Sequence, residues 1–402
     1  MLPGLRWLDI RCGLAFVLAA VSTVGCGGGG TGGVDSGGTG ARATSFASGT
    51  ITGFGSVIVT GVHFDDLGAA VSDADGNARS RGDLRLGMTV DVRGSAIVVD
   101  ADGHDASTAT SFLINSAIVG PVAANDPTAR TLTVLGQTID VASTTVFDNG
   151  LAGGQSALAP GDVVEVHASF NAAAGRYAAT RVERRTAVAS YAVRGIASKL
   201  DAGSRTFSIG SLRLSYAGLG TAPTALVSDA FVRVSIGLAP GASGVWRALR
   251  IGDGSPPVDD RPEAKVEGLV DAFTSSARFT VNGTPVDARN AEFPDGTQGL
   301  AIGRRVEVEG QTVAGVLVAS RVEQVSDSEE SGTQFDVRGT ITSIDTAGKT
   351  LVVRGVVVSY SGSVDFRDGT AADLAIGREV EARGMLSPDG TRLQAVRLDF
   401  RH

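Results

Sequence analysis

Apolar and polar residues alternate in a short phrase that occurs five times along the chain. The clearest copies read LAIGRRVEVEG from Leu300 and LAIGREVEARG from Leu374, and the other copies begin at Leu84, Leu158 and Leu226. Their starts lie 74, 68, 74 and 74 residues apart. A fixed period of this kind is the signature of a repeat protein. The sequence therefore predicts five copies of one small unit.

The alternation inside the phrase predicts a β-strand with one buried face. In the fourth copy it sends Val306 and Val308 to one side of the strand, and Glu307 and Glu309 to the other. Successive side chains of a strand point to opposite faces of the sheet. We therefore expect the valines in a core and the glutamates on a solvated face.

Each unit of about 70 residues also contains patterns for four further strands. A strand through a glycine opens the unit, and a hairpin with glycine at its bend, such as Asn282-Gly283, follows it. A strand such as LVASRVE closes the unit, and no helical period is long enough to matter. The pattern predicts an all-β chain of five tandem, OB-like, five-stranded β-barrels, although a period cannot determine strand order.

The predicted boundaries follow from the repeats and from shifts in composition. They are a signal peptide at 1–25, a lipid-attachment cysteine and glycine-rich tether at 26–45, barrel repeats at 46–115, 116–186, 187–253, 263–325 and 334–402, a proline-rich linker at 254–262 and an acidic linker at 326–333.

The N-terminal segment has the features of an export signal. Arg6 and Arg11 precede the apolar run GLAFVLAAVSTVG, which is too short to span a bilayer, and Cys26 follows it directly. A cysteine at this place is similar to the processing site of bacterial lipoproteins. We expect a lipid on Cys26 that attaches the chain to a membrane of the envelope, with the outer membrane as the expected location. Ordinary secretory cleavage with a free Cys26 is the alternative.

Charge and motifs exclude several classes of function. A net charge of −8 with only three lysines lacks the basic surface that a nucleic-acid phosphate backbone requires. His63, His104, His167 and His402 lack the close spacing of a zinc site, and we expect them in solvent. The run from Asp100 through Asp102 to His104 begins like a calcium loop but does not continue as one. We expect an Asp-Gly turn there, and no cofactor or catalytic residue.

Most aromatic residues fall on core positions of the repeat. Phe46, Phe170 and Phe231 do not fit this register. In the third copy Phe231 points away from the core valines and Ile236 continues the apolar run, which predicts an exposed apolar patch unless a neighbouring barrel covers it. Phe231, Ile236 and Phe170 are therefore the candidate interface residues.

The first two units carry a resemblance to a known family. The segments GTITGFGSVIVTGVHFD, DLRLGMTVDVRG and AIVGPV with LTVLGQTIDV resemble bacterial exported lipoproteins built from a repeated domain of unknown function, the one catalogued as five-six-six-six. The resemblance implies export, lipid attachment and a small β-barrel unit, but no activity. Together with the patterns above, it favours a non-enzymatic envelope protein whose barrels bind or space an envelope protein or a glycan. An envelope hydrolase with a site between barrels is the alternative.

Overall fold

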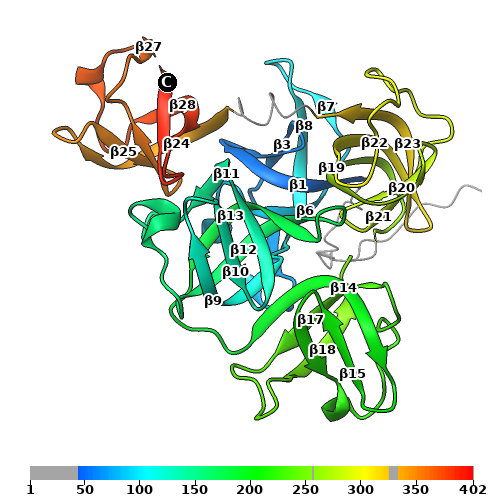
Figure 1. Cartoon of the computed structure of the whole chain (residues 1–402). Coiled ribbons are helices and arrows are strands. Elements are labelled where there is room, and N and C mark those ends of the chain that lie inside the picture. The colour runs from blue at the N-terminus through cyan, green and yellow to red at the C-terminus, as the bar shows by residue number, and fades with distance from the viewer. Residues whose placement is uncertain (1–43, 256–257, 326–333, 402) are drawn as a thin grey trace, which may run out of the picture. The chain divides into compact units, whose positions relative to one another are not determined.

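The structure is a computed structural model that describes residues 44–255, 258–325 and 334–401 (Figure 1). All regular structure in these ranges consists of β-strands and four short 3-10 turns, namely Arg81–Asp83, Gly154–Ala157, Ala217–Leu219 and Ala371–Asp373. No helix in these ranges is long and apolar enough to cross a membrane. The predicted signal peptide, Cys26 and most of the tether lie outside the described residues.

The second repeat, barrel 2, shows the plan of one unit. Its strands are β9 (Ile118–Asp126), β10 (Thr131–Val134), β11 (Gln137–Phe147), β12 (Val163–Asn171) and β13 (Arg176–Arg184). Antiparallel pairs join β9 to β10, β10 to β11, β13 to β12 and β12 to β9, and a parallel pair joins β11 to β13. The five strands thus form a closed ring in the order first, second, third, fifth, fourth.

The same ring occurs in the other four units. Barrel 1 comprises β1 (Ser45–Phe54), β2 (Val57–Val59), β3 (Val62–Asp65), β4 (Ala70–Asp73), β5 (Ala78–Arg79), β6 (Thr89–Gly94), β7 (Val98–Val99) and β8 (Asp105–Ile114). Barrel 3 comprises β14 (Tyr191–Asp201), β15 (Thr206–Ile209), β16 (Leu212–Ser215), β17 (Phe231–Ile236) and β18 (Trp246–Asp253). Barrel 4 comprises β19 (Arg261–Ser275), β20 (Arg278–Val281), β21 (Thr284–Asp287), β22 (Arg305–Val313) and β23 (Val316–Gln324). Barrel 5 comprises β24 (Phe335–Asp345), β25 (Thr350–Val353), β26 (Val356–Ser359), β27 (Asp365–Arg367), β28 (Glu379–Leu386) and β29 (Leu393–Phe400).

The pairing pattern confirms the predicted fold class. In every unit the third ring strand pairs in parallel with the fifth, as β3 does with β8 and β26 with β29. A five-stranded ring of this order is an OB-like Greek-key barrel. Barrel 1 adds the short strands β4, β5 and β7, and barrel 5 adds β27. The linker predicted at 254–262 is shorter than expected, because β19 already begins at Arg261.

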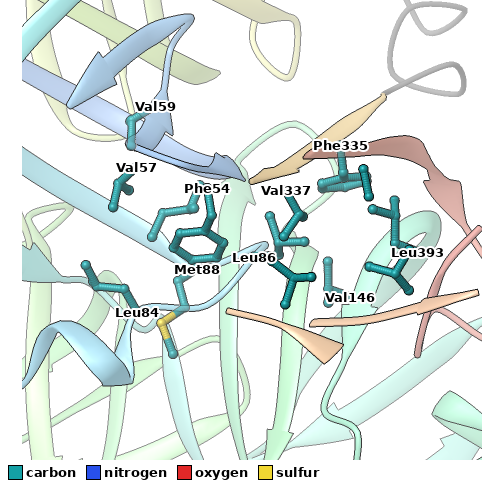
Figure 2. Packing of buried hydrophobic residues seen from close by; sticks show 14 of the residues in the cluster. Phe54, Val57, Val59, Leu84, Leu86, Met88, Val146, Phe335, Val337 and Leu393 are labelled. Carbon is teal, nitrogen blue, oxygen red and sulfur yellow. The ribbon is translucent and has the colours of Figure 1, made fainter. Parts of the chain in front are cut away.

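Burial follows the predicted alternation. Val306 and Val308 are fully buried in barrel 4, as expected. In barrel 1, Phe54, Val57 and Leu86 belong to a hydrophobic cluster that also contains Val337 of barrel 5 (Figure 2). Burying a large aliphatic or aromatic side chain contributes about 1.5–3 kcal/mol. Apolar burial therefore stabilises the interior of each small barrel, and it also stabilises the contact between barrels 1 and 5.

Candidate functional site: a polar cleft on barrel 1

A cleft of about 640 Å³ opens on the loop side of barrel 1. Its walls include Gly55 and Ser56 between the first two ring strands, His63 on β3, and the connection between β6 and β8 that contains Val98. In OB-type barrels the loops between strands one and two and between strands four and five, together with strands two and three, form the usual ligand face. The cleft occupies this face.

One wall of the cleft carries two histidines and two aspartates. His63 lies on β3, and β3 pairs with β8 so that His63 is opposite Ala106. The turn between β7 and β8 supplies Asp100, Asp102 and His104, and the backbone N–H of Asp100 donates to the carbonyl oxygen of His104 at 2.8 Å. The imidazole rings of His63 and His104 stack with centroids 4.5 Å apart and planes inclined by 4°.

The other wall comes from barrel 5. Strand β24 pairs in parallel with the end of β1, which places Asp336 opposite Gly53 at the cleft. Arg383 on β28 donates from Nε to Asp336 at 2.8 Å, and its Nη2 donates to Glu381. Arg401 also donates to Glu381. Carboxylates and guanidinium groups thus alternate along this wall.

The electrostatics of the cleft differ between its two walls. Burial, followed by repulsion from His104, lowers the pKa of His63, so this ring is neutral at pH 7. Burial, followed by the charge of Glu381, raises the pKa of Asp336. Burial works against ionisation of Glu381 as well, but the hydrogen bond from Arg401 and the charge of Arg383 outweigh it and lower the pKa of Glu381. Of these two carboxyl groups, Glu381 therefore ionises at the lower pH.

The candidate interface residues predicted from the sequence lie elsewhere. Ile236 is fully buried, so its assignment to an exposed patch was wrong. It follows Val232 and Val234 with the two-residue period of a strand and therefore faces the core. Phe231 is partly buried: the Arg194 guanidinium lies 5.1 Å from its ring centroid, and the Phe170 ring lies 6.4 Å away.

Other aromatic residues behave as expected from the repeat register. Phe207 is buried, and Tyr191, Trp246 and Phe293 are partly buried and pack against the cores of barrels 3 and 4. Phe46, which does not fit the register, is also a core residue, because it lies on β1 and packs with the core of barrel 4. Among these aromatics, only Phe170 and Phe231 line a second, much smaller cavity of about 30 Å³.

The expectation that the histidines lie in solvent is corrected at His167. His167 is fully buried rather than in solvent, and its Nδ1 accepts the backbone N–H of Thr89 of barrel 1 at 3.2 Å. Burial lowers its pKa.

His63 and His104 are 41 positions apart in the sequence, and the pairing of β3 with β8 brings them together. The one local signal for the cleft was the turn from Asp100 to His104, and the sequence carried no signal for Asp336, Glu381 or Arg383.

The fold and the cleft together define the class of protein. The chain is a series of tandem OB-like barrels, and barrel 1 has a polar cleft on its ligand face. The family model described as "Domain of unknown function (DUF5666)" matches residues 119–183, 267–323 and 338–399, which fall in barrels 2, 4 and 5. These segments make up a little under half of the chain, and they establish that it contains a repeated domain of unknown function. The resemblance seen in the sequence was most specific in the first two units, and the family model matches the second of these. No curated protein matches the chain.

Proposed function

We propose that the chain is a non-enzymatic protein of the bacterial cell envelope, exported and anchored by a lipid on Cys26, whose barrel 1 cleft binds a polar ligand, either a glycan or a segment of another envelope protein. The position of the cleft on the ligand face of an OB-type barrel carries this proposal. Histidine, carboxylate, hydroxyl and guanidinium groups line it, as suits a ligand rich in hydroxyl or amide groups. The acidic charge of the chain argues against a nucleic acid.

The lipid anchor rests on the apolar run that leads directly into Cys26. Radiolabelled palmitate should enter the wild-type chain in a bacterial host and should not enter Cys26→Ser. Equal labelling of both chains, or recovery of the wild type in the soluble periplasmic fraction, would refute the anchor. The cleft can bind its ligand with or without the lipid, so this result does not decide the binding proposal.

The binding role is tested by site-specific photo-crosslinking in the native envelope. A photoreactive amino acid replaces Ser56 at the cleft, and Ala347, in the corresponding loop of barrel 5, serves as the matched control. We expect adducts at position 56 and none at position 347. When Arg383→Ala is added to the chain with the photoreactive residue at position 56, these adducts should be lost. Protease digestion of the adduct then separates a protein ligand from a glycan. Equal adducts at both positions would contradict a specific cleft ligand.

One observation favours the alternative of an envelope hydrolase. Asp336 holds a raised pKa beside the ionised Glu381 within the cleft, which is the arrangement of an acid and a base. Both carboxylates are, however, bound by Arg383, and Glu381 also by Arg401. Groups held in this way suit fixed recognition better than proton transfer. Hydrolysis of peptidoglycan fragments by the wild type that Asp336→Asn abolishes would establish the enzyme instead.

A further inference from the structure

The turn between β7 and β8 gathers three metal-ligating side chains. One donor atom each of Asp100, Asp102 and His104 lies within 4.8 Å of the others. His104 Nδ1 lies 3.8 Å from Asp100 Oδ2. Donors around a tetrahedral zinc ion with bonds of about 2.1 Å lie about 3.4 Å apart. Small rotations of these accessible side chains are enough to close the set around one ion.

The two oxygens of Asp100 have separate partners. Oδ1 accepts the backbone N–H groups of Asp102 and His104, both at 2.9 Å, and so holds the turn. Oδ2 is the atom near the His104 ring. The hydrogen bonds of the turn therefore use Oδ1, and Oδ2 is the carboxylate oxygen on the side of the His104 ring.

A second observation comes from a different strand. His63 on β3 stacks on the His104 ring, with centroids 4.5 Å apart and planes inclined by 4°. This contact is no part of the turn, because the pairing of β3 with β8 produces it. Parallel rings at this distance cannot both direct a nitrogen at one ion, so His63 acts on the orientation of His104 rather than as a ligand. Ligating histidines commonly depend on such neighbours for their ring position.

We propose that Asp100, Asp102 and His104 bind a divalent transition-metal ion of the zinc class, and that His63 is a positioning residue for His104. A ligand set of one imidazole and two carboxylates suits zinc and similar divalent transition-metal ions. Calcium and magnesium prefer oxygen ligands alone. Three protein ligands leave a coordination position for water or for a group of a bound ligand. Because Asp100, Asp102 and His104 line the cleft, the open coordination position of the ion faces the cleft.

The test uses the full chain, purified in detergent and stripped of metal with a chelator. Calorimetric titration with zinc chloride should show about one ion bound per chain, with affinity at least about tenfold weaker in His104→Ala and in Asp102→Asn. Cobalt(II) should give visible absorption bands of a nitrogen- and oxygen-ligated ion in the wild type, and His104→Ala should lose them. These readouts need no cleft ligand, so failure of metal binding and failure of the proposed function are separate results.

The matched control is Asp345→Asn. The Asp345 carboxylate accepts two backbone N–H groups of its own turn in barrel 5, as Asp100 does, but Asp345 belongs to none of the metal-ligand groups in the described residues. Zinc affinity should be unchanged in this variant. His63→Phe keeps a stacked ring and should retain affinity within about threefold, whereas His63→Ala should weaken binding. Absence of zinc binding, or equal binding by wild type and His104→Ala, overturns the site; loss of binding in His63→Phe overturns the role given to His63.

Discussion

Three glutamates lie side by side across the outer face of barrel 4. Cross-strand pairing places Glu267 opposite Glu307, and Glu307 opposite Glu323. Glu307 is partly buried, and burial, followed by the charge of Glu267, raises its pKa to about 7, with Lys265 acting in the opposite direction. Like charges directly opposite one another destabilise a sheet. Alternation correctly placed Glu307 on the outer face, but the expectation that it is freely solvated was wrong.

The Glu307→Gln variant should be more stable than the wild type at pH 8. The unfolded chain ionises Glu307 near its ordinary pKa of 4.5, whereas the folded chain keeps the proton up to a pKa of about 7. The folded state therefore binds more protons between these values, and the contribution of Glu307 to stability falls as pH rises through this window. Glutamine removes this penalty. We expect a gain of roughly 1–3 kcal/mol at pH 8 and little difference at pH 4, measured by urea unfolding.

Glu309→Gln is the matched control for this prediction. Glu309 lies on the same face of β22, but it is paired with the ammonium group of Lys265 at 2.8 Å. Removing its charge should leave stability unchanged or reduce it at both pH values. A gain at pH 8 equal to that of Glu307→Gln would show that general charge reduction, and not the glutamate row, is responsible.

At the scale of the element, every barrel has the same bulge between its fourth and fifth ring strands. In barrel 4, Glu309 pairs with Arg321 and Gly310 with Ala319, so Ser320 is the extra residue. Thr110, Thr180, Leu249 and Val396 take its place in barrels 1, 2, 3 and 5. The hydroxyl groups of Thr110, Thr180 and Ser320 donate to carbonyl oxygens of the fourth strand at 3.0–3.1 Å. The bulge bends these strands, as a small barrel requires.

Gly310, which ends the repeated phrase in barrel 4, lies at this bulge, where the partner strand leaves no room for a side chain. A Cβ atom on Gly310 would lie 2.1 Å from the Val318 carbonyl oxygen, and one on Gly384 in barrel 5 would lie 2.0 Å from that of Gln394. Gly310→Ala should therefore lower the free energy of unfolding by roughly 1–3 kcal/mol, the usual cost of overpacking. Thermal or urea unfolding measures the loss.

Gly252→Ala is the control for the bulge glycine. Gly252 also lies in a strand, β18, but a Cβ atom there would meet nothing within 4 Å. Its replacement should change stability by less than about 0.5 kcal/mol. An equal loss in both variants would mean that glycine in these strands matters through general backbone effects and not through the bulge.

At the scale of the whole molecule, Phe231 lies where barrels 2, 3 and 4 meet. It begins β17 of barrel 3 and packs near Phe170 of barrel 2, and a Cβ atom on Gly283 of barrel 4 would lie 3.3 Å from its ring. The Arg194 guanidinium, within 5.1 Å of the ring centroid, adds a cation–π contact. Neighbouring barrels thus cover the side chain, which is the condition under which the sequence predicted no exposed patch.

Phe231→Ser should therefore lower stability by roughly 1–3 kcal/mol through lost apolar burial. Leu249→Ser, at a bulge position that is 38% exposed, is the control and should change stability by less than about 0.5 kcal/mol. Urea unfolding compares the two variants. Unchanged stability together with the loss of a cross-linked partner would instead assign Phe231 to a binding surface.

The amino-acid sequence by itself determined the five copies, the all-β class and the inward valines, such as Val306 and Val308. These features follow from periods of two residues within a strand and of about 74 residues between copies, and both can be counted along the chain. It also placed the Asp100–His104 turn, because Asp-Gly turns are local.

Only the tertiary structure decided the closing order of each ring, the stacking of His63 on His104 and the place of Asp336 beside barrel 1. The pairing of β3 with β8 joins residues about 40 positions apart, and that of β1 with β24 joins residues nearly 300 apart. Such pairings depend on how whole strands pack against one another. No local period records that packing, so the walls of the cleft exist only in the folded chain.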